Sequence, residues 1–257
     1  MRLPILTLCA ALVAAPLAAS ELVGHRAIYK LTLETARGDV IGATGTMGYE
    51  VIDACDAWAV RQRLAINITS RDGSDVDLAA DYTTWESKDG LRLRFRMRQS
   101  TDDMLVTDLA GTAKLDSVGG EGEATYAVPA DTVKKLPAGT MFPTAHTELI
   151  LESAKAGKRF LAVPLFDGTN ADGAQDSTVA ITGWSAPATM QWPELSTLPS
   201  TRVRIAFFDR EGSKQQPDYE VGMRYFANGI ADTLSMDFGD YVLSGKLSEL
   251  QVTKPNC

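Results

Sequence analysis

Residues 81–98, DYTTWESKDGLRLRFRMR, predict an antiparallel β-hairpin that turns at Asp89-Gly90. Successive side chains of an extended strand point to opposite faces, so the arginines after the turn share one face and the apolar residues between them share the other. We call this set the arginine stripe, and its members are Arg92, Arg94, Arg96 and Arg98. With a strand rise of about 3.3 Å per residue, the stripe spans about 20 Å.

The turn also determines the register of the hairpin. It places Trp85 opposite Arg94 and Asp81 opposite Arg98, which predicts a cation–π contact and a cross-strand ion pair. Acids offered by the next strand are Asp102 and Asp108. Two interpretations of the arginine stripe stay open. It is either a solvated, locally paired sheet face or an interaction surface for lipid phosphates or an acidic protein partner.

Alternation of polar and apolar residues continues along most of the chain and predicts antiparallel sheet. Between residues 21 and 99 it is interrupted by turn sequences at 37–39, 72–74 and 89–90. Further strands are expected at 105–115, 124–128, 160–166, 177–184, 201–208, 219–226, 230–237 and 241–252. About a dozen strands are more than one open, twisted sheet usually holds without curling, so a mainly β fold that closes or spirals is expected.

One segment, residues 143–157, breaks the alternation and predicts a single short α-helix. It has a threonine as N-cap candidate, acidic residues early, Lys155 late and Gly157 just past the end. Residues 187–199, which include Trp192, Pro193 and Pro199, are expected to form an irregular connection rather than a domain linker.

The amino-terminal residues 1–20 have the pattern of a cleaved signal peptide. Arg2 supplies a short positive region, residues 3–17 are apolar, and residues 18–20 are small. Residues 21–257 are expected to form one exported domain with a net charge of 24 − 33 = −9. This charge disfavours nucleic acid as a partner, and no later segment has the apolar length of a membrane span.

Two cysteines remain after removal of the signal, Cys55 and Cys257. Export to an oxidising compartment makes a disulfide between them the expected state. Its loop would hold 257 − 55 + 1 = 203 residues, and closing such a loop stabilises a fold by at most about 5 kcal/mol. The alternative is a redox or catalytic thiol, which would have to recruit His25 or His146.

Several segments stand in a recognisable order: GY at 48–49, DACDAW at 53–58 with Gln62 close behind, FPTAHT at 142–147, LFDG at 165–168 and the terminal Cys257. Together they resemble the EipB family, periplasmic cell-envelope integrity proteins of Gram-negative bacteria, over about residues 22–257. The resemblance implies a β-spiral, in which many antiparallel strands wind into an open, barrel-like sheet with a helix. It also matches Cys55 and Cys257 to the family's stabilising disulfide. It further implies a periplasmic location, a partner of the tetratricopeptide-repeat type and no enzymatic activity.

The rest of the sequence contains no strong motif for a catalytic nucleophile or a metal site. The GWSAP sequence at 183–187 lacks the closing glycine of a nucleophile elbow, and no pair of His or Cys has zinc-ligand spacing. His146 is expected to pack or hydrogen-bond near the start of the helix. The acidic loop 167–173 is interpreted as a surface turn, with an irregular calcium site as the alternative. We therefore expect no catalytic residues, cofactor or metal.

Two noncatalytic functions follow. In the first, the protein supports cell envelope integrity through a periplasmic protein or peptide partner. In the second, it is a carrier whose concave sheet face shelters a lipid or a lipoprotein acyl chain, at roughly 0.8 kcal/mol for each CH₂ group removed from water. The carrier requires apolar space inside the sheet, whereas an interior filled by side chains would exclude it. A third function, hydrolysis of envelope polymers, would need a nucleophile or paired carboxylates that no motif supplies.

Overall fold

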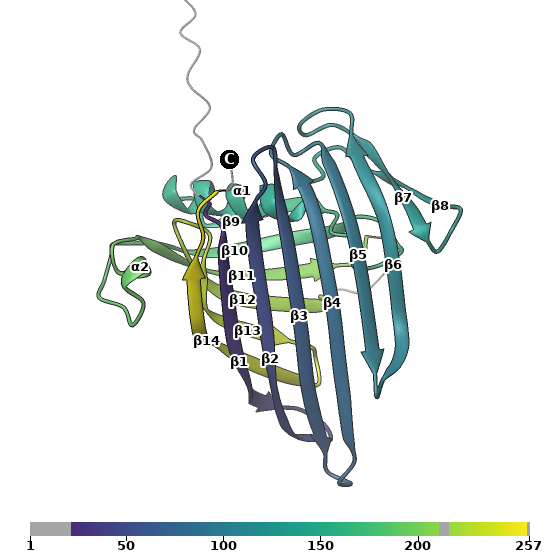
Figure 1. The fold of residues 1–257 in the computed structure, drawn as a ribbon, viewed down its shortest axis with the longest axis vertical. Helices are drawn as coiled ribbons and strands as arrows, with labels where there is room; N and C mark the ends of the chain where they lie inside the picture. Colours follow the sequence, from purple (N-terminus) through teal and green to yellow (C-terminus); the bar gives the residue numbers. More distant parts are fainter. Residues whose placement is uncertain (1–21, 211–215, 256–257) are drawn as a thin grey trace, which may run out of the picture.

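One antiparallel β-sheet organises the computed structural model, which describes residues 22–210 and 216–255. Within these residues the sheet has 14 strands, in the spatial order β8-β7-β6-β5-β4-β3-β2-β1-β14-β13-β12-β11-β10-β9. The first and last strands of the chain are therefore neighbours in the middle of the sheet, and β8 and β9 are its edges (Figure 1). The predicted signal peptide, residues 1–20, lies outside the described residues.

The strands differ in length between the two halves of the sheet. The first half comprises β1 (His25–Ala36), β2 (Val40–Asp53), β3 (Ala57–Ser70), β4 (Asp75–Ser87), β5 (Arg92–Thr101), β6 (Met104–Leu115), β7 (Gly122–Val128) and β8 (Thr132–Leu136). The second half comprises β9 (Phe160–Leu165), β10 (Gln175–Ser185), β11 (Ser200–Phe208), β12 (Tyr219–Phe226), β13 (Ala231–Asp237) and β14 (Tyr241–Val252). The helices are α1 (Pro143–Lys155) and α2 (Pro193–Ser196).

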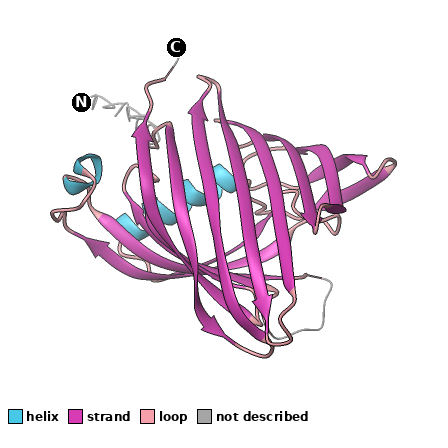
Figure 2. Cartoon of the chain, turned by 60° about the horizontal axis from the view of Figure 1, so that its bottom comes forward, coloured by secondary structure: helices cyan, strands magenta, loops and turns pink. Residues whose placement is uncertain are grey.

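The two halves of the sheet cross over one another. Strands β1 to β6 run along the long axis of the molecule, and β9 to β13 run across behind them (Figure 1). Figure 2 shows the resulting curl from another side, with α1 lying across the strands. In the part of the chain that is described, β8 and β9 are not paired with each other, so the sheet is not closed. The expected fold, a mainly β, open barrel-like sheet with many antiparallel strands, is confirmed.

Two short elements go beyond the expectation of about a dozen strands and one helix. Strand β8 has five residues, and its two apolar residues do not share a face, since Val133 is exposed and Leu136 is buried, so it has no alternating pattern. Helix α2 is a single turn inside the segment that we expected to be irregular, and Pro193 stands in its first turn. Proline is well suited to that position because its missing N–H would have no partner inside a helix.

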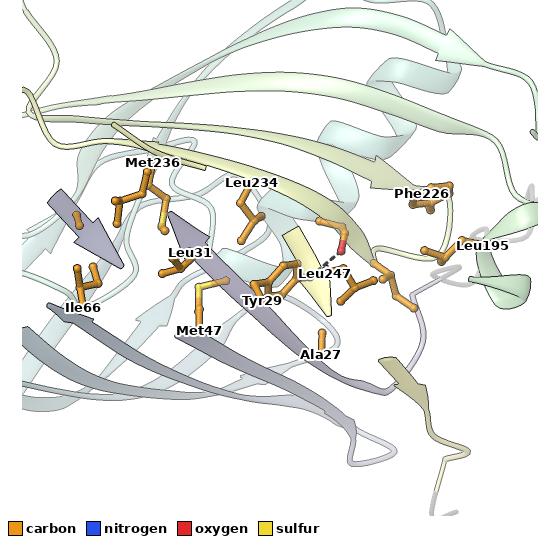
Figure 3. Packing of buried hydrophobic residues seen from close by; sticks show 14 of the residues in the cluster. Ala27, Tyr29, Leu31, Met47, Ile66, Leu195, Phe226, Leu234, Met236 and Leu247 are labelled. Carbon is orange, nitrogen blue, oxygen red and sulfur yellow. Dashed lines mark hydrogen bonds between the residues drawn. The ribbon is translucent and has the colours of Figure 1, made fainter. Parts of the chain in front are cut away.

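The main core lies between the two halves of the sheet. Figure 3 shows Tyr29 of β1 and Met47 of β2 together with Leu234 and Met236 of β13. All four are at most 8% exposed. They occupy inward positions of their strands, so the alternating pattern places their apolar surface in the core. The Tyr29 hydroxyl donates a hydrogen bond of 2.7 Å to the backbone oxygen of Ala231, which satisfies the one polar group of this buried side chain.

Helix α1 packs on the second half of the sheet. Its buried residues Ile150 and Ala154 belong to one cluster with Val179 of β10 and Val203 of β11. Ile150 and Ala154 are four residues apart and therefore lie on one helix face. This packing holds α1 against β10 and β11, with its first turn directed toward the first half of the sheet.

The amino-terminal cap of α1 comes from a different strand. The N-cap residue is Phe142, which makes no side-chain cap bond, so the predicted threonine N-cap is wrong. The first turn contains no acidic residue, so the expected acids at the start of the helix are wrong as well. The Glu86 carboxylate of β4 instead accepts hydrogen bonds from the backbone N–H groups of Thr144, at 2.7 Å, and Ala145, at 2.8 Å. Because these N–H groups have no partner within the helix, Glu86 performs the capping and ties the two halves of the sheet together.

Candidate functional site

A cavity of about 290 Å³ lies between the two halves of the sheet. One wall comes from β1 to β4, and the other comes from α1, β11, β12, β13 and the end of β9. Most lining side chains are apolar, among them Met47, Val60, Ile205 and Met223. The volume is close to the lower end of the range of about 300–1,000 Å³ that is usual for small-molecule sites. The interior is therefore not filled completely by side chains.

A row of polar side chains crosses the first wall of the cavity. The strand register pairs Tyr49 of β2 with Gln62 of β3, and Gln62 with Tyr82 of β4. All three residues line the cavity, and directly paired residues have Cβ atoms about 4.5–5.5 Å apart. The Tyr82 hydroxyl donates a hydrogen bond of 2.6 Å to the backbone oxygen of Asp167, so the row also joins the two walls.

Two carboxyl groups lie at or beside the cavity. Asp167 lines it, and Glu86 binds the backbone of Thr144, which also lines it. Burial raises the pKa of Glu86 to about 7, although the N–H groups of Thr144 and Ala145 lower it. Burial likewise raises the pKa of Asp167, while hydrogen bonds from Thr169 oppose this effect. Both acids are therefore held where a negative charge is poorly solvated.

Both histidines of the chain line the cavity, and both are buried. Burial lowers the pKa of His146 to about 4 and also lowers the pKa of His25. His146 Nε2 is 3.1 Å from Ser177 Oγ, and His25 Nδ1 is 2.9 Å from the backbone oxygen of Val23. Ser177 is 0% exposed. The His146–Ser177 pair therefore has the expected packing role near the start of the helix, and its hydroxyl is not open to a substrate.

The loop from residue 167 to 173 bonds to itself. Asp167 Oδ1 accepts hydrogen bonds from the backbone N–H of Thr169, at 3.0 Å, and from its hydroxyl, at 2.8 Å. Asn170 Oδ1 accepts one from the backbone N–H of Asp172 at 2.9 Å. These contacts are those of a turn, but Asp167 lines the cavity, so the segment is not the plain surface turn that was expected. Across residues 22–210 and 216–255, no group of three His, Cys, Asp or Glu side chains could hold a metal ion.

The arginine stripe lies on the face opposite to the cavity wall. All four arginines are exposed, whereas Leu93 and Phe95 between them are buried. The register pairs Trp85 with Arg94 as predicted. The guanidinium carbon of Arg94 is 4.9 Å from the centroid of the Trp85 ring, so the predicted cation–π contact is confirmed.

The predicted ion pair between Asp81 and Arg98 is wrong. The register does place these residues opposite each other, but Asp81 binds Arg63 of β3 at 2.8 Å. Arg96 is paired with Asp108 at 2.9 Å, one of the two acids expected from the next strand. Asp81 lies opposite Arg63 of β3 on one side and opposite Arg98 of β5 on the other. Because its carboxylate binds Arg63, it does not form the ion pair with Arg98. The role of the arginine stripe as an interaction surface stays a prediction.

Cys55 lies in the turn between β2 and β3, where its φ angle is 71°. Its backbone N–H donates a hydrogen bond of 3.0 Å to Asp53 Oδ1, and its sulfur is part of a disulfide. Cys257 lies outside the described residues. The pairing of Cys55 with Cys257 therefore stays a prediction.

Among the residues that line the cavity, the sequence suggested candidate roles only for His25, His146 and the loop from residue 167 to 173. Gln62 and the other residues of the segments at 142–147 and 165–168 entered only as parts of the family resemblance, yet the fold brings them together. In the last segment Phe166 is fully buried. A Cβ atom added at Gly168 would lie 2.3 Å from atoms of the Phe95 ring, so only glycine fits there. These segments thus meet at one cavity. Their spacing along the sequence did not indicate that they lie together.

Comparison with known proteins identifies relatives over almost the whole chain. The model of the EipB-like family matches residues 16–254. The cell envelope integrity protein EipB of Brucella abortus (strain 2308) is 32% identical over 242 residues, which cover 91% of this chain and 85% of that protein. A crystal structure of a β-barrel-like protein of a domain of unknown function, also from Brucella abortus, superimposes with a TM-score of 0.83. Its sequence identity is 31%, and the match covers 92% of this chain and 100% of that one.

Proposed function

This chain belongs to the EipB-like family, and from this premise we propose that it supports cell envelope integrity by binding, without catalysis, an acyl chain of a lipid or lipoprotein. The cavity between the two halves of the sheet carries this proposal, because it offers about 290 Å³ of mostly apolar space. A periplasmic location is part of the proposal and is supported by the predicted signal peptide and by the disulfide of Cys55. In the described residues, no helix has the length and apolarity to cross a membrane.

The driving force for this binding is the removal of the acyl chain from water. Each methylene group that enters the cavity contributes roughly 0.8 kcal/mol. The cavity is too small for a whole phospholipid and suits part of one chain. The cavity walls come from distant parts of the sequence, and the curl of the sheet places them on opposite sides of the same space.

Native mass spectrometry of the protein extracted gently from its own periplasm tests the proposal. We expect a bound mass of lipid size that is released on denaturation in organic solvent. Val60→Phe, which fills part of the cavity, should abolish the bound mass, whereas Val118→Phe, at a residue 78% exposed, should retain it. A bare protein mass in the wild type would contradict cavity binding.

A second candidate function is an interaction with a protein or peptide, for which the resemblance suggests a partner of the tetratricopeptide-repeat type. The observation that favours it is the exposed arginine stripe in a protein of net negative charge. Arg94→Glu with Arg96→Glu should abolish crosslinking to an acidic partner in periplasm. Lys158→Glu with Lys254→Glu changes the charge equally at other exposed positions and should leave crosslinking intact. Equal crosslinking by both double variants would count against the stripe.

A further inference from the structure

Among the described residues, the polar side chains of the cavity lining that make no side-chain hydrogen bond are Tyr49, Gln62, Thr84 and Tyr219. Two of them, Tyr49 and Gln62, are directly paired on β2 and β3. Gln62 carries two N–H donors and one acceptor oxygen, and Tyr49 carries one hydroxyl. Tyr82, the third member of the row, is already bonded to Asp167. Among these groups, Tyr49 and Gln62 are the two that are neighbours across paired strands, so their unused donors and acceptors lie beside each other.

Among the described residues, the lining of the same cavity contains no positively charged side chain. No lysine or arginine of residues 22–210 and 216–255 lines it, Asp167 does, and Glu86 is bonded to the lining residue Thr144. The remaining basic groups are His25 and His146, and burial lowers the pKa of each, so both are neutral at pH 7. A carboxylate or phosphate placed here would lose its hydration without gaining a counter-charge. The site is thus unfavourable to anions and supplied with neutral hydrogen-bonding groups.

We propose that the cavity selects ligands whose buried polar group is uncharged, namely an ester, amide or hydroxyl on an alkyl chain, and that Gln62 and Tyr49 recognise this group. The inference rests on the proposed acyl-chain binding and adds its selectivity. A free fatty acid is rejected in its ionised form. An esterified or amide-linked chain is accepted because its carbonyl oxygen accepts a hydrogen bond from the Gln62 amide or the Tyr49 hydroxyl.

Three probes of equal chain length test the selectivity on the purified wild-type protein. Decanol, methyl decanoate and decanoate are titrated at pH 8, below the concentrations at which they aggregate, in competition with the neutral fluorescent probe N-phenyl-1-naphthylamine. We expect decanol and methyl decanoate to bind at least about tenfold more tightly than decanoate, because only decanoate must lose the hydration of a charge. Equal or tighter binding of decanoate overturns the inference. If none of the three compounds binds, the proposed function itself fails and the selectivity fails with it.

A charge-changing variant tests the recognition residue. Gln62→Lys should increase the affinity for decanoate by about tenfold or more, since it places a cation at the recognition point. Gln251→Lys makes the same change at an exposed residue of β14 and should leave the preference as in the wild type. An unchanged preference in Gln62→Lys, with circular dichroism showing a folded protein, removes Gln62 from the proposed role. Should Gln62→Lys not fold, Gln62→Leu should weaken methyl decanoate binding, and undiminished binding contradicts the proposal.

Discussion

Replacing Glu86 by glutamine should remove the pH dependence that this residue gives to stability. Thr144 and Ala145 donate to different oxygens of the Glu86 carboxylate, so the single oxygen of the glutamine introduced by Glu86→Gln replaces only one of these acceptors, and the substitution also removes the ionisable group. Burial raises the pKa of Glu86 from 4.5 to about 7 in the folded protein. That difference corresponds to about 3 kcal/mol of unfolding free energy.

The sign of this effect follows from the raised pKa. The folded state binds a proton more tightly than the unfolded state, so the contribution of Glu86 to stability is fully present below about pH 4.5 and is lost as the pH rises through about 7. The other groups with shifted pKa values, including His146, are common to both proteins and cancel in their difference. Between pH 5 and pH 8 the wild type should therefore lose about 2–3 kcal/mol relative to Glu86→Gln, because a part of the full difference is already lost at pH 5.

Urea unfolding of both proteins at four pH values between 5 and 8 measures this difference directly. Glu121→Gln, at an exposed carboxylate, is the matched control and should differ from the wild type by an amount that does not change over this range. A difference between the wild type and Glu86→Gln that is independent of pH would refute the reasoning. It would mean that the carboxyl group of Glu86 is as well solvated in the folded protein as in the unfolded chain.

Two further predictions concern the disulfide and the glycine at residue 168. Cys55→Ser should melt at a lower temperature than the wild type under oxidising conditions, by an effect of at most about 5 kcal/mol. Reductant should bring the wild type to the same melting temperature, and identical melting of both proteins with and without reductant would argue against the Cys55–Cys257 pair. Gly168→Ala should destabilise the fold by about 1–3 kcal/mol or more in urea unfolding, because the new Cβ would lie 2.3 Å from the Phe95 ring. Gly119→Ala shares the positive φ angle but has open space around it; an equal loss in both would show that backbone strain alone is responsible.

Local pattern was sufficient for much of the sheet, because the direction of a side chain in a strand depends only on its position in the alternation. The register of β4 and β5, the exposed arginine stripe and the contact of Arg94 with Trp85 all follow from one short turn and the period of two residues. The predicted ion pair between Asp81 and Arg98 was wrong although it rested on the same local pattern. The register was correct, but the choice of ion-pair partner depended on Arg63 of β3, which the hairpin sequence does not include.

By itself the sequence determined a mainly β chain with a curled sheet, one main helix and a single stripe of arginines. The tertiary structure alone decided that β1 lies beside β14, that Glu86 caps α1, and that Tyr49 and Gln62 face a cavity together with Asp167. The physical reason is that strand alternation and turn chemistry act over a few residues. The cavity and its charge balance arise where segments far apart in the chain pack against each other, and no local period encodes how completely two such surfaces fill the space between them.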